Sequence, residues 1–249
     1  MTGVTLEEVA AALDGSDWSE VLRLTDAILA EHPGDDAAHE LRARALLAVG
    51  RLDEAERHAN DAVRLDPEEI RYRELLAQVL SRAGAHRDAA AEFARLARAD
   101  PRQTEWTVGE ATERIEAAQP AMAVEAARRA VTLEPTNGRA QLALAQALIR
   151  TADVRGALQA ASHATELLPG DVAAREARAD AYWLADETEA AFAEFHALAA
   201  ELDDADQARV EAKARALYRR SGGWSRRLVA AVGPVFRIGF RRGVLRVGR

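Results

Sequence analysis

The chain has 249 residues, of which 49% are hydrophobic and only 5% aromatic, and it carries a formal net charge of −8. It contains no cysteine, which excludes disulfide bonds, thiolate metal sites and cysteine nucleophiles. With so few aromatic residues, a core must be built largely from Ala, Leu and Val. This favours closely packed helices, because Ala has the highest helix propensity, and it fits a reducing compartment.

The N-terminus and the hydropathy of the chain bear on its location. Residues 1–15 include acidic residues and lack the basic region and apolar stretch of a secretory signal. No stretch approaches the roughly 18 uninterrupted apolar residues that span a bilayer. We therefore expect a cytoplasmic protein.

Five of the seven prolines recur at intervals of 34 residues, and this recurrence predicts a supersecondary unit repeated in tandem. They are Pro33, Pro67, Pro101, Pro135 and Pro169. Because proline cannot continue a helix and keeps the preceding residue out of the α region, each should end a helix and fix the corner to the next unit. The predicted units are residues 2–35, 36–69, 70–103, 104–137, 138–171 and 172–205.

Two positions within the unit recur as small residues, where two helices would cross closely. Position 8 holds Val9, Ala43, Ala77, Ala111, Ala145 and Ala179, and position 20 holds Val21, Ala55, Ala89, Ala123, Ala157 and Ala191. Positions 24 and 27 are largely apolar and give the second helix one buried face.

This pattern resembles the tetratricopeptide repeat. Residues 41–67, LRARALLAVGRLDEAERHANDAVRLDP, are similar to the consensus of that family, with Gly50 at the turn between two helices. The resemblance covers residues 2–205. It implies an all-α, right-handed α-solenoid of six helix-turn-helix repeats, in which each first helix lines a concave face that holds other proteins.

Three units depart from the pattern. Repeat 1 has Val9, Val21 and Thr25 where small or aromatic residues are usual, as expected of an atypical end unit. Repeat 4 has Glu110 and Arg114 at positions that are normally apolar, and Pro120 opens its second helix. Because burial of an unpaired charge is costly, its first helix is expected either in the regular place or shifted and loosely packed. Repeat 6 has Asp203 in place of the closing proline, and residues 206–220 are expected to form a capping helix.

The chain has no catalytic signature: no phosphate-binding glycine loop, dinucleotide fingerprint, zinc-protease motif or nucleophile elbow. Its six histidines never pair at i, i+3 or i+4, so no single helix face presents two imidazoles to a metal. His58 and Asp61 can be drawn as a base and its orienting group, but a polar helix face explains them better. The acidic residues around Asp203 lack the glycine and distal glutamate of a calcium loop. We therefore expect no enzymatic activity, no cofactor and no metal.

The concave face is the stronger candidate for a binding site. The resemblance places positions 2, 5, 9 and 12 or 13 of each first helix there. We expect arginines to bind an extended or helical segment of a partner protein by charge-assisted hydrogen bonds, with one tryptophan as an aromatic anchor. The alternative is ordinary charged helix surface. The selected groove residues are Arg44, Arg71, Glu74, Gln78, Arg82, Arg139, Gln146, Arg150, Glu176, Asp180 and Trp183.

Residues 221–249 form a basic tail. They carry seven arginines and no acidic residue, which leaves −15 on residues 1–220 because the whole chain carries −8. A helical projection separates apolar residues from arginines and predicts an amphipathic helix, kinked at Pro234. The residues expected to contact a membrane or an acidic partner are Trp224, Arg226, Arg227, Leu228, Phe236, Arg237, Phe240, Arg241 and Arg242.

Several functions stay open for this tail. It can lie on the anionic inner face of a membrane or on an acidic partner, or it can pack on its own last repeat. A disordered arm or a nucleic-acid contact is disfavoured, the latter because the acidic body repels phosphate. The leading hypothesis is a scaffold or adaptor. The alternative is a regulatory subunit of an enzyme or assembly complex, with the tail as a structural cap. Homo-oligomers through stacked solenoid ends are also compatible with the sequence.

Overall fold

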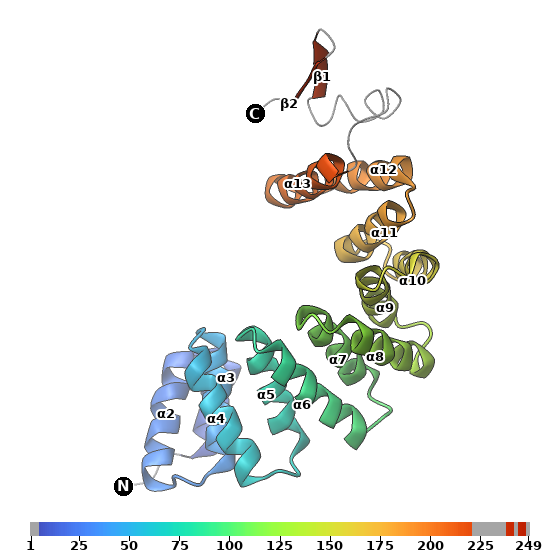
Figure 1. Cartoon of the computed structure of the whole chain (residues 1–249). Coiled ribbons are helices and arrows are strands. Elements are labelled where there is room, and N and C mark those ends of the chain that lie inside the picture. The colour runs from blue at the N-terminus through green and yellow to red at the C-terminus, as the bar shows by residue number, and fades with distance from the viewer. Residues whose placement is uncertain (1–4, 221–237, 242–243, 248–249) are drawn as a thin grey trace. The chain divides into compact units, whose positions relative to one another are not determined.

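The computed structural model describes residues 5–220, 238–241 and 244–247. These residues form thirteen helices and two short strands (Figure 1). The helices follow one another as helical hairpins with a final capping helix, so the predicted fold class is confirmed. The chain divides into two compact units, Met1–Ala126 and Ala127–Arg249.

The first unit is built from consecutive hairpins in which each helix packs against the next. Helix α3 also contacts α1 and α5, so the first helices of neighbouring hairpins lie side by side. The boundary between the two units falls within α8 (Pro120–Leu133). The helices that precede α8 are α1 (Leu6–Asp14), α2 (Trp18–Glu31), α3 (Asp36–Ala48), α4 (Leu52–Leu65), α5 (Ile70–Arg82), α6 (His86–Ala99) and α7 (Thr104–Glu116).

The second unit repeats this arrangement. Helix α9 contacts α10 and α11, and α13 packs on α12 and covers the last hairpin. In the part of the chain that the structure describes, no helix combines the length and the apolar character needed to cross a bilayer. The helices after α8 are α9 (Gly138–Arg150), α10 (Val154–Leu167), α11 (Val172–Leu184), α12 (Thr188–Ala199) and α13 (Asp204–Arg220).

The recurring prolines mark the corners between hairpins. The residue before Pro33 is the C-cap His32, with φ −130° and ψ 76°, and Asp66 before Pro67 has φ −131° and ψ 93°. These are the non-helical angles that a following proline favours. The next helix begins soon after each corner, where Asp35, for example, accepts a hydrogen bond from the backbone N–H of Ala38 at 2.8 Å. The prediction that each such proline ends a second helix is confirmed.

The turn inside each hairpin contains one residue in the left-handed region, with φ between 55° and 78°. These residues recur every 34 positions and are glycine in only two repeats, so four turns place a side chain where it is unfavourable. They are Ser16, Gly50, Gly84, Ala118, Ala152 and Asp186.

The small residues at positions 8 and 20 are the places where paired helices meet. All twelve of them are 0% exposed, from Val9 and Val21 in the first hairpin to Ala179 and Ala191 in the last. Larger apolar residues such as Leu46, Leu76 and Val79 fill the space around them. The predicted close crossings are therefore confirmed: the alanines of repeats 2 to 6 leave room for the backbones to approach, and the first repeat has Val9 and Val21 in their place.

Repeat 4 keeps its first helix in the regular place. Glu110 is 4% exposed, but Arg114 lies one turn further along α7 and pairs with it at 2.8 Å. Gly109 faces the Phe93 ring of α6, and a Cβ added there would lie 2.9 Å from Cδ1 of that ring. The buried charge is thus compensated within the helix, and α7 packs closely on α6.

Part of the tail contradicts the predicted helix. Strands β1 (Ile238–Arg241) and β2 (Val244–Val247) pair antiparallel, with Ile238 opposite Val247. Short runs with β-branched residues favour extended structure, so the helix is wrong for β1, which contains Phe240 and Arg241. The other predicted contact residues lie outside the described residues: Trp224, Arg226, Arg227, Leu228, Phe236, Arg237 and Arg242.

Candidate functional site

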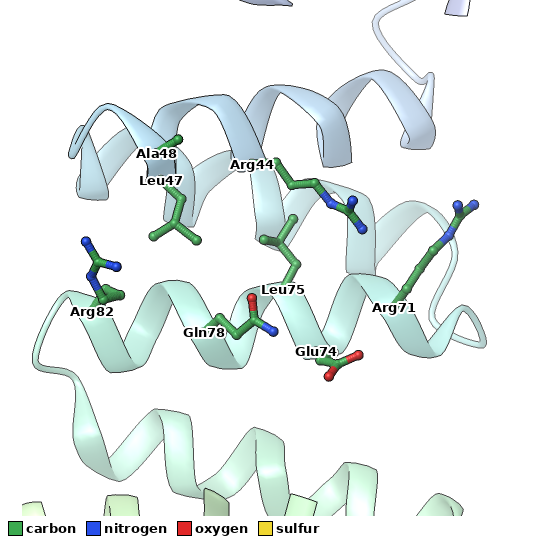
Figure 2. Close-up of a pocket in the computed structure, with 8 residues that line it drawn as sticks. All are labelled: Arg44, Leu47, Ala48, Arg71, Glu74, Leu75, Gln78 and Arg82. Atoms are coloured by element: carbon green, nitrogen blue, oxygen red, sulfur yellow. The ribbon is translucent and has the colours of Figure 1, made fainter. Parts of the chain in front are cut away.

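A depression of about 440 Å³ lies between the first helices of the second and third hairpins; we call it the α3–α5 depression. Figure 2 shows Leu47 and Leu75 between the two helices, with Arg82 toward one end and Arg71 toward the other. The centre is therefore apolar and the edges are cationic. The complete lining is Arg44, Leu47, Ala48, Arg71, Glu74, Leu75, Gln78 and Arg82.

Five predicted groove residues meet in this depression: Arg44, Arg71, Glu74, Gln78 and Arg82. They come from two helices that are neighbours in space because the 34-residue unit repeats. The structure thus brings together the part of the predicted groove that belongs to repeats 2 and 3. Whether this part binds a partner stays a prediction.

The three arginines differ in how far they are already neutralised. Arg44 pairs with the carboxylate of Glu40, which is 3% exposed. Arg71 lies 3.5 Å from Glu69, and its guanidinium lies 5.1 Å from the centre of the Tyr72 ring. Arg82 is exposed and has no ion-pair or hydrogen-bond partner among the residues that the structure describes. A ligand carboxylate would find its most available cation at Arg82.

Glu40 lies close to this cationic edge and reduces its positive charge. Burial raises the pKa of Glu40, while the charges of Arg44 and Arg71 lower it in part. The carboxylate therefore competes with any bound anion for Arg44. The electrostatic attraction of the depression is strongest away from Glu40.

The second unit contains a smaller depression of about 260 Å³, the α11–α13 depression. Three predicted groove residues line it, but its acidic groups are already paired with the capping helix. Nζ of Lys213 lies 2.6 Å from Oδ2 of Asp180 and 3.2 Å from Oε2 of Glu176. Burial also raises the pKa of Asp180. The lining is Gln146, Val172, Ala173, Glu176, Ala177, Asp180, Arg209 and Lys213.

Three predicted groove residues line neither depression. Arg139 and Arg150 are exposed on α9. The Trp183 ring packs edge-on against Phe192, with ring centres 5.9 Å apart, and contacts the core cluster of the last hairpin. Trp183 thus contributes to packing, and its predicted role as an aromatic anchor stays untested.

Comparisons with known proteins identify the family. Residues 12–79 match the family model described as Tetratricopeptide repeat, and the helical hairpins match solved structures of such proteins. Residues 12–79 belong to the tetratricopeptide repeat family, and the described hairpins share its fold. No curated protein sequence is significantly similar to it.

Three solved structures illustrate the likeness of fold. A tetratricopeptide repeat protein from Parabacteroides merdae has a TM-score of 0.71 at 16% identity, covering 91% of this chain and 95% of that one. YrrB, described as a TPR protein with an unusual peptide-binding site, has a TM-score of 0.57 at 20% identity, with 76% and 97% covered. The APC/C hetero-tetramer Cut9–Hcn1 gives 0.63 at 14% identity, with 86% and 42% covered. Identities this low show the fold alone.

Sequence reasoning missed two basic residues that line the α11–α13 depression, Arg209 and Lys213. Both come from α13, for which the sequence predicts only the role of a capping helix. The charge pattern held a usable signal, since Lys213 is the only lysine of the chain and lies opposite the acidic residues selected in repeat 6. The cap is part of the site because it stands where the first helix of another repeat would stand.

Sequence reasoning also missed a polar cluster in the second hairpin. His39 of α3 and His58 of α4 meet with their Nδ1 atoms 2.8 Å apart, beside Asp61. Ligand atoms of these three residues lie within 4.8 Å of one another. The expectation that no helix face carries two imidazoles is true of single helices, but here two helices supply one imidazole each.

Proposed function

We propose that this protein is a non-catalytic scaffold that binds an acidic segment of a partner protein in the α3–α5 depression. The observation that carries the proposal is the exposed Arg82, which has no partner in the described part of the chain and stands beside an apolar centre. Such a combination attracts a carboxylate and also offers apolar contact area.

The charge balance favours an anionic ligand. The lining contains three arginines and one glutamate, which gives two net positive charges. The buried Glu40 beside Arg44 removes one of them. Arg71, which lies 3.5 Å from Glu69, and Arg82 then remain as the main cations of the edge. Since depressions that carry one sign of charge concentrate ligands of the other sign, we expect Asp and Glu residues in the partner segment.

The distance between these cations sets the spacing of acidic residues that we expect in the ligand. Arg71 and Arg82 are eleven residues apart on α5, which corresponds to about 16 Å along the helix axis. An extended segment spans this distance with about five residues. We therefore expect two acidic side chains about five residues apart, with an apolar residue between them that contacts Leu47 and Leu75.

The comparisons support a protein or peptide ligand in general. YrrB is a TPR protein with a peptide-binding site, and Cut9 belongs to a hetero-tetramer. The second of these favours the alternative that this chain is a regulatory or structural subunit of a complex. Both functions use the same surface, and they differ in whether the partner stays bound.

Selection of peptides by the purified protein tests the proposal. A phage-displayed library of random 12-residue peptides is panned on the wild type, on an Arg71→Glu/Arg82→Glu variant, and on a control variant with the exposed Arg87→Glu. We expect the wild type and the control to enrich Asp- and Glu-rich peptides. The double variant should bind those peptides at least about tenfold more weakly, since charge-assisted hydrogen bonds contribute about 1.5 kcal/mol or more. Enrichment without acidic residues, or equal binding by all three proteins, would refute the proposal.

For the tail we propose a location at the inner face of the cytoplasmic membrane or on an acidic partner. The support is its charge, seven arginines without a compensating carboxylate in residues 221–249. Flotation with anionic and neutral liposomes, for the full chain and for a chain ending at residue 220, measures this. Anionic vesicles should retain only the full chain. Equal flotation of both chains would exclude the membrane, and the acidic partner or the structural cap would then apply.

A further inference from the structure

His39, His58 and Asp61, which we call the His-His-Asp cluster, lie between the two helices of the second hairpin. Nδ1 of His39 is 2.8 Å from Nδ1 of His58 and 3.9 Å from Oδ2 of Asp61. The side chain of His39 is 9% exposed, and that of Asp61 is 38% exposed. The cluster is thus anchored in the protein on one side and reachable from solvent on the other.

The repeat register shows how unusual these residues are at their positions. In the third hairpin the equivalent positions hold Arg73, Glu92 and Arg95, and the glutamate pairs with both arginines, Arg73 at 2.8 Å. In the sixth hairpin Arg175 and Glu194 pair at 3.1 Å at the first two of these positions. Those hairpins place a carboxylate between cations supplied by the chain itself.

The second hairpin has no arginine at the three equivalent positions. The three positions carry two imidazoles and a carboxylate, which are groups that supply lone pairs rather than a permanent positive charge. We propose that the His-His-Asp cluster binds one divalent transition-metal ion such as Zn²⁺, through Nδ1 of His39, Nδ1 of His58 and a carboxylate oxygen of Asp61. Two imidazoles and one carboxylate leave a fourth position for water, as in known open zinc sites.

His39 is already oriented as a metal ligand. Its Nε2 lies 3.1 Å from the backbone oxygen of Pro33. That oxygen can only accept a hydrogen bond, so the proton of neutral His39 is on Nε2 and the lone pair of Nδ1 points into the cluster. Histidine ligands of metals are commonly held in this way by a carbonyl or carboxylate.

Arg42 is the group that opposes metal binding. Its Nε donates to Nε2 of His58 at 3.1 Å, which leaves the His58 proton on Nδ1. When a metal takes Nδ1, that proton moves to Nε2, and the Arg42 Nε contact must open. The Arg42 charge is partly offset by Asp26 at 2.7 Å, and its NH1 keeps a bond to the backbone oxygen of Leu22 at 3.0 Å. Arg42 should therefore weaken metal binding without preventing it.

The necessary movement is small. Zn–N bonds of about 2.0–2.1 Å in a tetrahedral site place two nitrogens about 3.3 Å apart. The two Nδ1 atoms at 2.8 Å must separate by about half an ångström, and Asp61 must approach His39 by a similar amount. The Asp61 oxygen, which lies within 4.8 Å of the His58 ligand atom, must also move toward His58. Side-chain rotations on α3 and α4 can supply these shifts, and a bound ion would tie the two helices together.

Isothermal titration of the untagged, chelator-treated full chain with ZnCl₂ at pH 7.5 tests the site. We expect saturable binding of one ion, and Co²⁺ in its place should give the visible absorption of a tetrahedral complex. His39→Gln and His58→Gln should each weaken binding at least about 100-fold, and Asp61→Asn about tenfold, because each removes one of three ligands. The matched control His163→Gln, an exposed histidine of α10, should bind as the wild type does.

Arg42→Gln separates a metal site from a simple hydrogen-bond network. Loss of the opposing charge should tighten Zn²⁺ binding by about tenfold. Circular dichroism of every variant checks that the helices are intact, and Asp61→Asn tests the site at an exposed side chain if the histidine variants unfold. The proposal is overturned if the folded wild type shows no saturable Zn²⁺ binding, or if the affinity is unchanged in folded Asp61→Asn and Arg42→Gln.

Discussion

Oε1 of Glu110 accepts a hydrogen bond from Nε of Arg114 at 2.9 Å, one turn further along α7. Both side chains are largely buried, at 5% and 14% exposure. Arg114→Ala would leave the carboxylate without this arginine, so we predict a loss of about 3 kcal/mol in the free energy of unfolding. Urea denaturation measures it. The double variant Glu110→Leu/Arg114→Leu should recover most of the loss, and an equal loss in both variants would mean that removal of the Arg114 partner is not the cause.

The left-handed turn residues predict stability changes of opposite sign. Ala152 has φ 59°, and Gly50 has φ 78° with no atom within 4 Å of an added Cβ. Ala152→Gly should therefore stabilise the protein by about 0.5–1 kcal/mol, and Gly50→Ala should destabilise it by about 1 kcal/mol, through the backbone alone. Thermal unfolding of both variants is sufficient. Shifts of the same sign would contradict the prediction.

Glu40 predicts a specific dependence of stability on pH. Burial raises the pKa of Glu40 above its ordinary value of 4.5, so between those two values the folded state binds more protons than the unfolded state. The Glu40 contribution to stability therefore falls as the pH rises through this window. Glu40→Gln lacks this titrating proton, so its stability relative to the wild type should improve as the pH rises above the ordinary value of 4.5. Urea denaturation across that range would show a constant difference if burial did not affect the carboxyl.

Removal of one cation should loosen the capping helix. Lys213 links α13 to Asp180 and Glu176, its side chain is 34% exposed, and Arg209 of α13 also pairs with Glu176 at 2.5 Å. Lys213→Ala should cost about 1 kcal/mol and speed amide hydrogen exchange in α13, whereas Lys213→Arg should retain protection. Equal exchange in wild type and Lys213→Ala would show that the Arg209–Glu176 pair and the apolar contacts of Val210 and Ala214 are sufficient to hold the cap.

Features that act locally could be predicted from the sequence. Pro33 and its equivalents constrain the residue before them whatever the rest of the chain does, so the corners followed from spacing alone. The buried positions followed for the same reason, since only small residues such as Ala43 and Ala55 allow two helices to cross at close range. The lining of the α3–α5 depression could be predicted in part, because the repeat register determines the helix face on which Arg44 and Arg82 lie.

Features that depend on contacts across helices could not be predicted. His39 and His58 are 19 residues apart, and only the packing of α3 on α4 brings their rings together. Helix α13 is one residue out of step with the repeat: the recurrence from Ala179 points to Lys213, but Ala214 is the buried residue. The repeat spacing alone therefore predicts no binding-site residue in α13. The strands at the end of the chain were missed because a helical projection takes no account of β-branched residues.

The most direct test of the scaffold function is site-specific photo-crosslinking in the native cell. A photoreactive amino acid at Gln78, in the centre of the α3–α5 depression, should form a covalent link to one partner protein, identified by mass spectrometry. We predict that Arg71→Glu/Arg82→Glu abolishes this link and that Arg87→Glu leaves it intact. No crosslinked protein at Gln78, or a link that survives reversal of both charges, would contradict binding in this depression.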